Sequence, residues 1–165
     1  MKKLLLVTFF TAITAQYSFA QDSTKTNQLS SLLGSYYDIK NALVGSDATT
    51  AATKASEFFK AVNAVDMNTM PEADHKAFMP LKEKLAFDAR HISESTSIEH
   101  QREHFASLST NMYALAKKVK LSEQPIYQEY CPMKKSYWLS TETMIKNPYY
   151  GKAMLTCGQV TQTLK

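Results

Sequence analysis

The sequence predicts a mainly α-helical fold, namely a four-helix up-down bundle followed by an irregular, cysteine-containing C-terminal module. Two observations support this fold class. Between residues 29 and 120, apolar side chains recur every three or four positions in four successive stretches, as in helices that bury one face. From residue 121 onward this spacing stops, and prolines, glycines, aromatic residues and both cysteines take its place. Because the intervals between the stretches are short, consecutive helices are expected to lie side by side in opposite directions.

The four helical stretches differ in how they begin and end. They cover residues 32–43, 48–65, 78–92 and 98–119. Gly45 and Ser46 separate the first two, since glycine commonly follows a last helical turn and serine caps the next helix. Pro71 suits the first turn of the third helix, and Pro80 is expected to kink or restart it, because proline lacks the N–H that a helix interior needs. In the fourth stretch, only Gln101 interrupts the apolar stripe.

The C-terminal module comprises residues 121–165 and is expected to be mostly irregular. Two short strands are predicted within it, over residues 126–130 and 137–139, where aromatic and apolar residues gather. A chain of this size makes one domain, so residues 21–165 are predicted to fold as a single unit.

The first 20 residues have the features of a cleavable secretory signal peptide. Lys2 and Lys3 form a positive start, residues 4–13 are apolar, and residues 18–20 offer small side chains for cleavage after Ala20. No later apolar run approaches the roughly 20 residues that cross a bilayer, so no membrane span is expected. The mature protein is therefore predicted to be soluble and periplasmic or secreted.

Charge and motifs argue against several functional classes. Loss of Lys2 and Lys3 with the signal peptide would lower the formal charge from +4 to +2, too little for a nucleic-acid surface. The chain has no phosphate-binding glycine loop and no nucleophile elbow. His100 and His104 do not form an H-E-x-x-H zinc motif, because their glutamate, Glu103, stands at the wrong position. A protein without enzymatic activity is predicted.

Four sulfur-containing side chains form two compact pairs in the C-terminal module. Cys131 and Met133 are two residues apart, and Met154 and Cys157 are three apart, which would place both sulfurs on one face of a helical turn. Thiolates and thioethers together suit a soft ion such as Cu(I) or Ag(I). The alternative is a disulfide between the two cysteines, which would close a loop of about 26 residues and stabilise the fold by about 3–4 kcal/mol.

Three histidines form a second candidate ligand set. His100 and His104 are four residues apart on the fourth helix, close enough to share a metal ion, and a zinc ion is also possible there. His91 precedes the short turn between the third and fourth helices, so it should lie near the same end of the bundle. The alternative is that all three are solvated surface histidines. The chain from 121 to 130 is long enough to fold back, so the sulfur and histidine sets could form one site.

The C-terminal motifs resemble the signature of an uncharacterised bacterial domain family that is common in Bacteroidetes. The resemblance is carried by YCPM at 130–133, YWLS at 137–140, NPYYG at 147–151 and MLTCG at 154–158. Members of this family occur alone after a signal peptide, or fused to the periplasmic adaptors of heavy-metal efflux pumps of the copper/silver type. The resemblance implies a role beside metal export.

These observations lead to two hypotheses about function. The first is a periplasmic protein that binds a soft metal ion, copper above all, and buffers it or delivers it to the adaptor of a heavy-metal efflux system. The second is a disulfide-stapled module that binds no metal and docks on a partner protein through its aromatic C-terminal surface.

Overall fold

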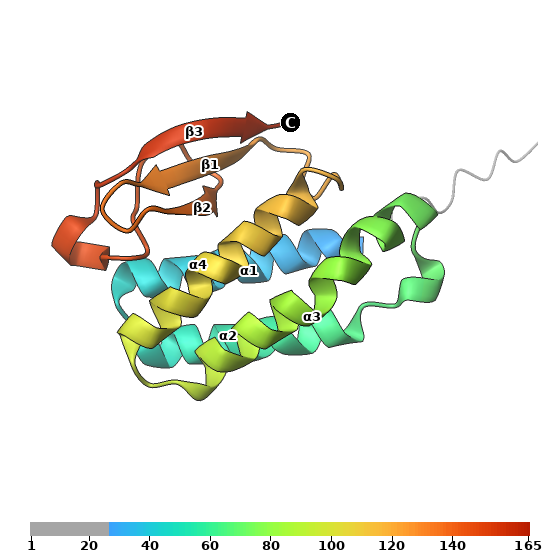
Figure 1. The fold of residues 1–165 in the computed structure, drawn as a ribbon, viewed down its shortest axis with the longest axis horizontal. Helices are drawn as coiled ribbons and strands as arrows, with labels where there is room; N and C mark the ends of the chain where they lie inside the picture. The colour runs from blue at the N-terminus through green and yellow to red at the C-terminus, as the bar shows by residue number, and fades with distance from the viewer. Residues whose placement is uncertain (1–26) are drawn as a thin grey trace, which may run out of the picture.

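The computed structural model describes residues 27–165 as a layer of helices with a small sheet packed against it (Figure 1). The predicted signal peptide, residues 1–20, lies outside the described residues. Within the described part of the chain, no helix combines the length and the apolar character that crossing a bilayer requires.

The mainly helical class is confirmed. The helices are α1 (Asn27–Gly45), α2 (Ala48–Ala64), α3 (Glu72–Glu94) and α4 (Ile98–Ala116), with a short 3₁₀ turn, η1 (Met67–Thr69). Each α-helix packs against the next one along the chain, and short connections join them at alternating ends of the layer (Figure 1). Their apolar stripes face a shared interior, so the helical periodicity of the sequence reports the buried face correctly.

Two details of the helix ends differ from expectation. Asp47, rather than Ser46, caps α2, because its side chain accepts a hydrogen bond from the Thr50 N–H at 2.9 Å. Ser46 instead takes a left-handed conformation with φ of 58°. The helix also does not restart at Pro80, since α3 continues through it as one element.

The C-terminal module is more regular than the sequence indicates. It contains β1 (Ile126–Cys131), β2 (Ser136–Ser140) and β3 (Gln159–Leu164), with a 3₁₀ turn, η2 (Gly151–Met154), before the last strand. The strands form one antiparallel sheet in the order β2-β1-β3. Both predicted strands are confirmed. The third was missed because all but the last of its residues are exposed, which leaves no alternating apolar pattern to read.

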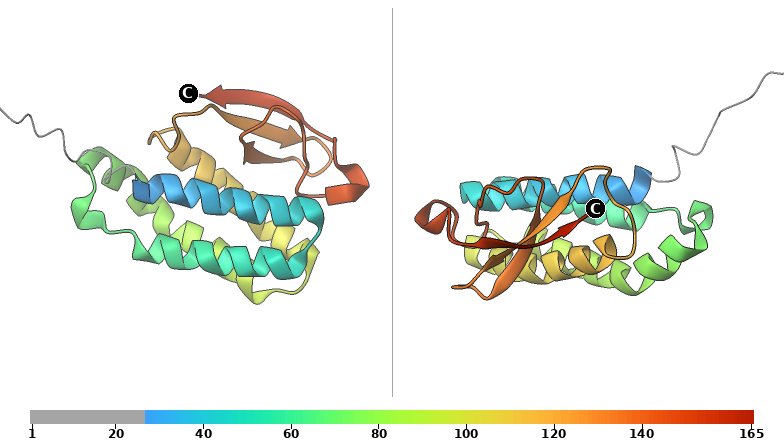
Figure 2. Two further views of the ribbon diagram at one scale, coloured as in Figure 1. Left: turned by 180° about the vertical axis from the view of Figure 1, so that it is seen from behind. Right: turned by 90° about the horizontal axis from the view of Figure 1, so that it is seen from above.

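The sheet covers the face of the bundle formed by α1 and α4 (Figure 2). Strand β2 packs on α4, and η2 packs on α1. Trp138 and Leu139 of β2 are fully buried and join the core of the helices. The core is therefore continuous from the α2–α3 side of the bundle to the sheet.

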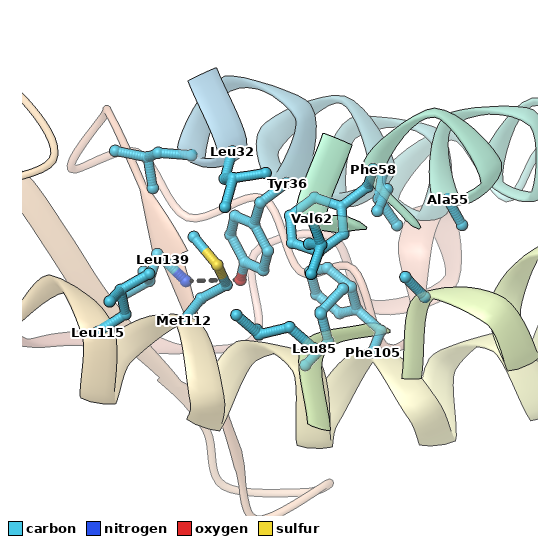
Figure 3. Close-up of a cluster of buried hydrophobic side chains, with 14 of the residues drawn as sticks. Leu32, Tyr36, Ala55, Phe58, Val62, Leu85, Phe105, Met112, Leu115 and Leu139 are labelled. Carbon is cyan, nitrogen blue, oxygen red and sulfur yellow. Dashed lines mark hydrogen bonds between the residues drawn. The ribbon is translucent and has the colours of Figure 1, made fainter. Parts of the chain in front are cut away.

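A buried tyrosine hydroxyl connects the two layers (Figure 3). Tyr36 of α1 has no exposed surface, and its hydroxyl lies 2.8 Å from Ser109 Oγ of α4. The same oxygen accepts the main-chain N–H of Leu139 in β2 at 3.0 Å. Phe105 of α4 stacks on the Tyr36 ring with centroids 5.2 Å apart. One side chain thus ties α1, α4 and β2 together inside the core.

Beside this joint, a second polar group lies buried between α1 and the sheet. Glu129 of β1 is fully buried, and within residues 27–165 the Trp138 side chain is the hydrogen-bonding group that interacts with its carboxylate. Burial raises the pKa of Glu129 to about 7, although the positive charge of Lys40 opposes this rise. Burial likewise lowers the pKa of Lys40, which is only 5% exposed. The carboxyl group is thus more readily protonated in the folded protein than in the unfolded chain.

The Tyr36→Phe variant should be less stable by about 1–3 kcal/mol, because it leaves the Leu139 N–H buried without a partner and removes one partner of the Ser109 hydroxyl. Urea unfolding followed by circular dichroism measures this change. Tyr127→Phe is the matched control, since the Tyr127 hydroxyl makes no hydrogen bond within residues 27–165 and its loss should leave stability almost unchanged. Equal stability of the two variants would contradict the role given to Tyr36.

The Glu129→Gln variant should change how stability depends on pH. The raised pKa means that the folded state keeps its proton longer, so wild-type stability should fall as the pH rises from about 5 through 7. Glutamine cannot ionise, so the variant should escape this decline and exceed the wild type above pH 7 by on the order of 1–3 kcal/mol. Urea unfolding at a series of pH values tests this. An exposed control, Glu83→Gln, should follow the wild-type curve.

Candidate metal centre

Three histidine side chains meet where α3 ends and α4 begins. His91 lies in the last turn of α3, and His100 and His104 lie in the first two turns of α4. Each imidazole offers a nitrogen that lies within 4.8 Å of the corresponding atoms of the other two. The sequence prediction that His91 shares an end of the bundle with the other two histidines is confirmed.

The imidazole rings pack closely on one another. His91 and His104 stack with centroids 4.5 Å apart and planes 19° apart, while His100 meets His104 edge-on at 4.7 Å. Phe87, one turn before His91, packs on both His91 and His104 at 4.3 and 5.8 Å. The aromatic ring therefore limits the rotation of two of the three candidate ligands.

The His104 imidazole contacts a buried carboxylate. Asp88 of α3 is only 3% exposed, and its Oδ1 lies 3.2 Å from Nδ1 of His104. Asn111 donates to the other carboxylate oxygen at 3.5 Å. A carboxylate that accepts from Nδ1–H fixes the tautomer in which Nε2 is free to bind a metal, and it makes that nitrogen more basic. Asp88 is thus a positioning residue for His104.

Gln101 stabilises the turn between α3 and α4 that brings the histidines together. The two N–H groups of its side-chain amide are shared among three carbonyl oxygens, those of Ser95, Ile92 and Ala48, at 2.7, 3.3 and 2.9 Å. Ser97 caps α4 by accepting the N–H of His100. This role explains a fully buried glutamine in an apolar stripe, because its amide joins carbonyl groups at the end of α3 to the first residue of α2.

The group of imidazoles is accessible from one side. The His100 side chain is 47% exposed, and its Nδ1 lies 3.8 Å from a carboxylate oxygen of Glu103. The His104 side chain is 19% exposed. Three neutral imidazoles with one open side can hold an ion such as copper or zinc and still leave a coordination position for an exchanging ligand.

The sulfur-containing residues form a separate group at the end of the sheet. Cys131 is the last residue of β1 and is fully buried, whereas Cys157 precedes β3 and is partly exposed. The two side chains are neighbours, and burial together with Cys131 raises the pKa of the Cys157 thiol. Met133 is 61% exposed in the β1–β2 turn. Met154 ends η2, and the Cys157 N–H bonds to the Met154 carbonyl oxygen at 3.1 Å, so residues 154–157 form one further turn, as expected.

The structure thus brings the three histidines together and makes the two cysteines neighbours, but it does not merge these two sets. Among residues 27–165, the group of close metal-ligating atoms contains the three histidines and no cysteine. The β1–β2 turn does fold back to the start of α4, where Lys134 lines the same hollow as Glu99 and Glu103. A single site built from both sets therefore stays a prediction.

A family model described as a protein of unknown function (DUF3347) matches residues 32–124. The chain belongs to this family. The expected membership of an uncharacterised domain family is confirmed at this level. The DUF3347 match begins within α1 and ends just before β1, so it includes all three histidines and Asp88, while Cys131 and Cys157 lie beyond it. No curated protein and no solved structure matches the chain.

Sequence reasoning missed Asp88 as part of the candidate site. The available indication was an acidic residue on the apolar face of α3, between Leu85 and Ile92. A carboxylate in that position requires a polar partner, because a buried charge is costly unless it is paired. The partner, His104, lies 16 residues away on the next helix, and only the packing of α3 on α4 identifies it.

The Asp88→Asn variant should bind metal about 10–100-fold more weakly, since partners of ligating histidines commonly contribute that much to affinity. Competition with a chromophoric chelator measures the affinity, and thermal unfolding checks that the variant is folded. Glu72→Gln removes one carboxylate from the far end of the same helix and should bind as the wild type does. If both variants bound equally well, Asp88 would have no positioning role.

Proposed function

We propose that this protein binds a copper ion through His91, His100 and His104 and buffers it or passes it to a heavy-metal efflux system. The observation that carries the proposal is the convergence of three imidazole nitrogens within 4.8 Å, with one imidazole oriented by a buried carboxylate. Solvated surface histidines would not require a buried acid behind them, because such an acid must lose its hydration.

Several arguments favour copper as the cargo. Imidazole ligands suit copper as well as zinc. The resemblance of the C-terminal motifs to a family associated with copper/silver efflux implies the same choice, with Ag(I) or zinc as other candidates. The predicted signal peptide fits a periplasmic location, where the adaptor of an efflux pump is the expected partner.

The exposure of the site supports transfer rather than permanent storage. A structural metal site is closed by its ligands, whereas an open site can accept a ligand from a partner. His100 is the most accessible of the three, so a donor from a partner can approach on that side. The ion would then be exchanged between proteins without being released into solution.

The test uses Cu(I) titrated against a competing chelator under anaerobic conditions, with the protein thiols oxidised beforehand so that they do not compete. The wild type should hold one ion per chain, and a His91→Gln, His100→Gln, His104→Gln variant should hold none. His75→Gln, which changes a histidine near the start of α3, is the matched control and should bind normally. Repeating the titration with Zn²⁺ compares the two metals.

A second candidate function is favoured by the contact between Cys131 and Cys157. Two adjacent thiols can close a disulfide, and the resulting stapled module could dock on a partner through exposed aromatic residues such as Tyr137, which is 42% exposed. This candidate requires no metal. Wild-type protein that binds neither copper nor zinc in the titration above would favour it over the copper proposal.

A further inference from the structure

The cysteine pair lies in a setting that points to a ligand of its own. The Cys131 sulfur receives the main-chain N–H of Lys134 at 3.4 Å. The Cys157 sulfur receives the main-chain N–H of Met133, and the two thiols contact each other. Burial and the neighbouring Cys131 raise the pKa of the Cys157 thiol, and the Met133 N–H opposes this rise. The pair is therefore held as thiols, and a metal ion binds by displacing their protons. The β1–β2 turn therefore holds two sulfurs against the same stretch of backbone.

The packing of Gly158 keeps Cys157 in this place. Glycine is required there because a Cβ would lie 2.8 Å from the Trp138 ring and 3.0 Å from the Tyr130 carbonyl oxygen. The chain can therefore pass directly over the indole ring and enter β3 with Cys157 beside Cys131. The position of the pair follows from the sheet and does not depend on the histidines.

Two methionines lie close to the cysteines in the sequence. Met133 is exposed and lies two residues after Cys131, and Met154 lies three residues before Cys157, whose N–H bonds to the Met154 carbonyl at 3.1 Å. Two thiols with nearby thioethers form a soft donor set that prefers a monovalent ion such as Cu(I) or Ag(I). The histidine set has nitrogen donors only.

We infer that Cys131 and Cys157, with Met133 as an exposed thioether, form a second site for a soft monovalent ion. This site binds the ion when both cysteines are thiols and loses the ion when they are oxidised to a disulfide. This inference rests on the proposed function only in taking copper as the cargo. Binding of Cu(I) by both sulfurs displaces their two protons. In oxidation, each thiol gives up one proton and one electron, a sulfur–sulfur bond forms, and the two electrons reduce the disulfide of an exchange partner to two thiols.

The site would make the metal capacity of the chain depend on redox conditions. In the reduced protein the sulfur pair and the histidine group can each hold an ion. In the oxidised protein the sulfur lone pairs remain, but no thiolate is available, and only the nitrogen donors bind. An oxidising compartment such as the periplasm would thus set how much copper the protein retains.

The experiment uses the variant without the three histidines, so that any binding comes from the sulfurs. After anaerobic reduction it should bind one Cu(I) per chain in competition with a chelator, and oxidation by glutathione disulfide should abolish this binding until the protein is reduced again. Cys157→Ser in the same background should bind no Cu(I) tightly, and Met133→Leu should bind more weakly with an unchanged thiol count. Cys157 is chosen because it is partly exposed, so its replacement should not leave a cavity in the core.

The wild type provides a second measurement if the histidine variant does not fold. Reduced wild type should bind one more Cu(I) than oxidised wild type. Equal binding in the two redox states, or no binding by the reduced histidine-free variant, would overturn the inference while leaving copper binding by the histidines untouched. If only the redox-dependent ion were found, the histidine proposal would fail and the sulfur site would stand.

Discussion

The buried hydroxyl of Tyr36 is the interaction on which the arrangement of the molecule depends. Helices α1 and α4 are not neighbours along the chain, and the sheet follows both of them. Because one oxygen bonds to Ser109 and to the main chain of Leu139, these three elements have a fixed position relative to one another. An apolar contact would resist separation of the layers but not sliding, whereas hydrogen bonds have preferred lengths and directions. The hydrogen bonds of Tyr36 therefore fix the position of the sheet along the helices.

The candidate metal centre uses the same principle at another place in the core. Gln101 and Asp88 are buried polar side chains at positions where the helical pattern calls for apolar ones. Gln101 fixes the α3–α4 turn, and Asp88 fixes His104. Polar groups inside a protein are costly unless they are paired. The Gln101 amide nitrogen is paired, whereas its Oε1 has no partner among residues 27–165. The histidines at the surface are thus arranged by residues that lie beneath them.

The helices could be predicted from the sequence because their evidence is local. The stripe through Leu32, Tyr36 and Ile39 reports one buried face, and a glycine or a cap reports an end. Strand β3 gave no such pattern because it is exposed on both faces and is held by pairing to β1. Pro80 does not restart the helix, since surrounding packing can hold α3 together across a missing N–H.

The candidate site was predictable to a similar extent. The spacing of His100 and His104 is local, and the short turn brings His91 near, so the triad could be anticipated. The link from His104 to Asp88 and the contact of Cys131 with Cys157 join residues that are far apart in sequence, and they required the tertiary structure. Whether sulfur and nitrogen donors act together is decided by how the β1–β2 turn lies on α4, which residue spacing does not encode.

The position of the triad across a helix–helix turn has a consequence for motion. Helix ends open and close more readily than helix centres, because fewer hydrogen bonds must break. His91 lies at one such end and His100 at another, with a three-residue connection between them. An ion bound by both histidines would hold the end of α3 and the start of α4 together, so metal binding would reduce local opening of these two helix ends. Conversely, a partner that loosened this turn would weaken all three ligands together.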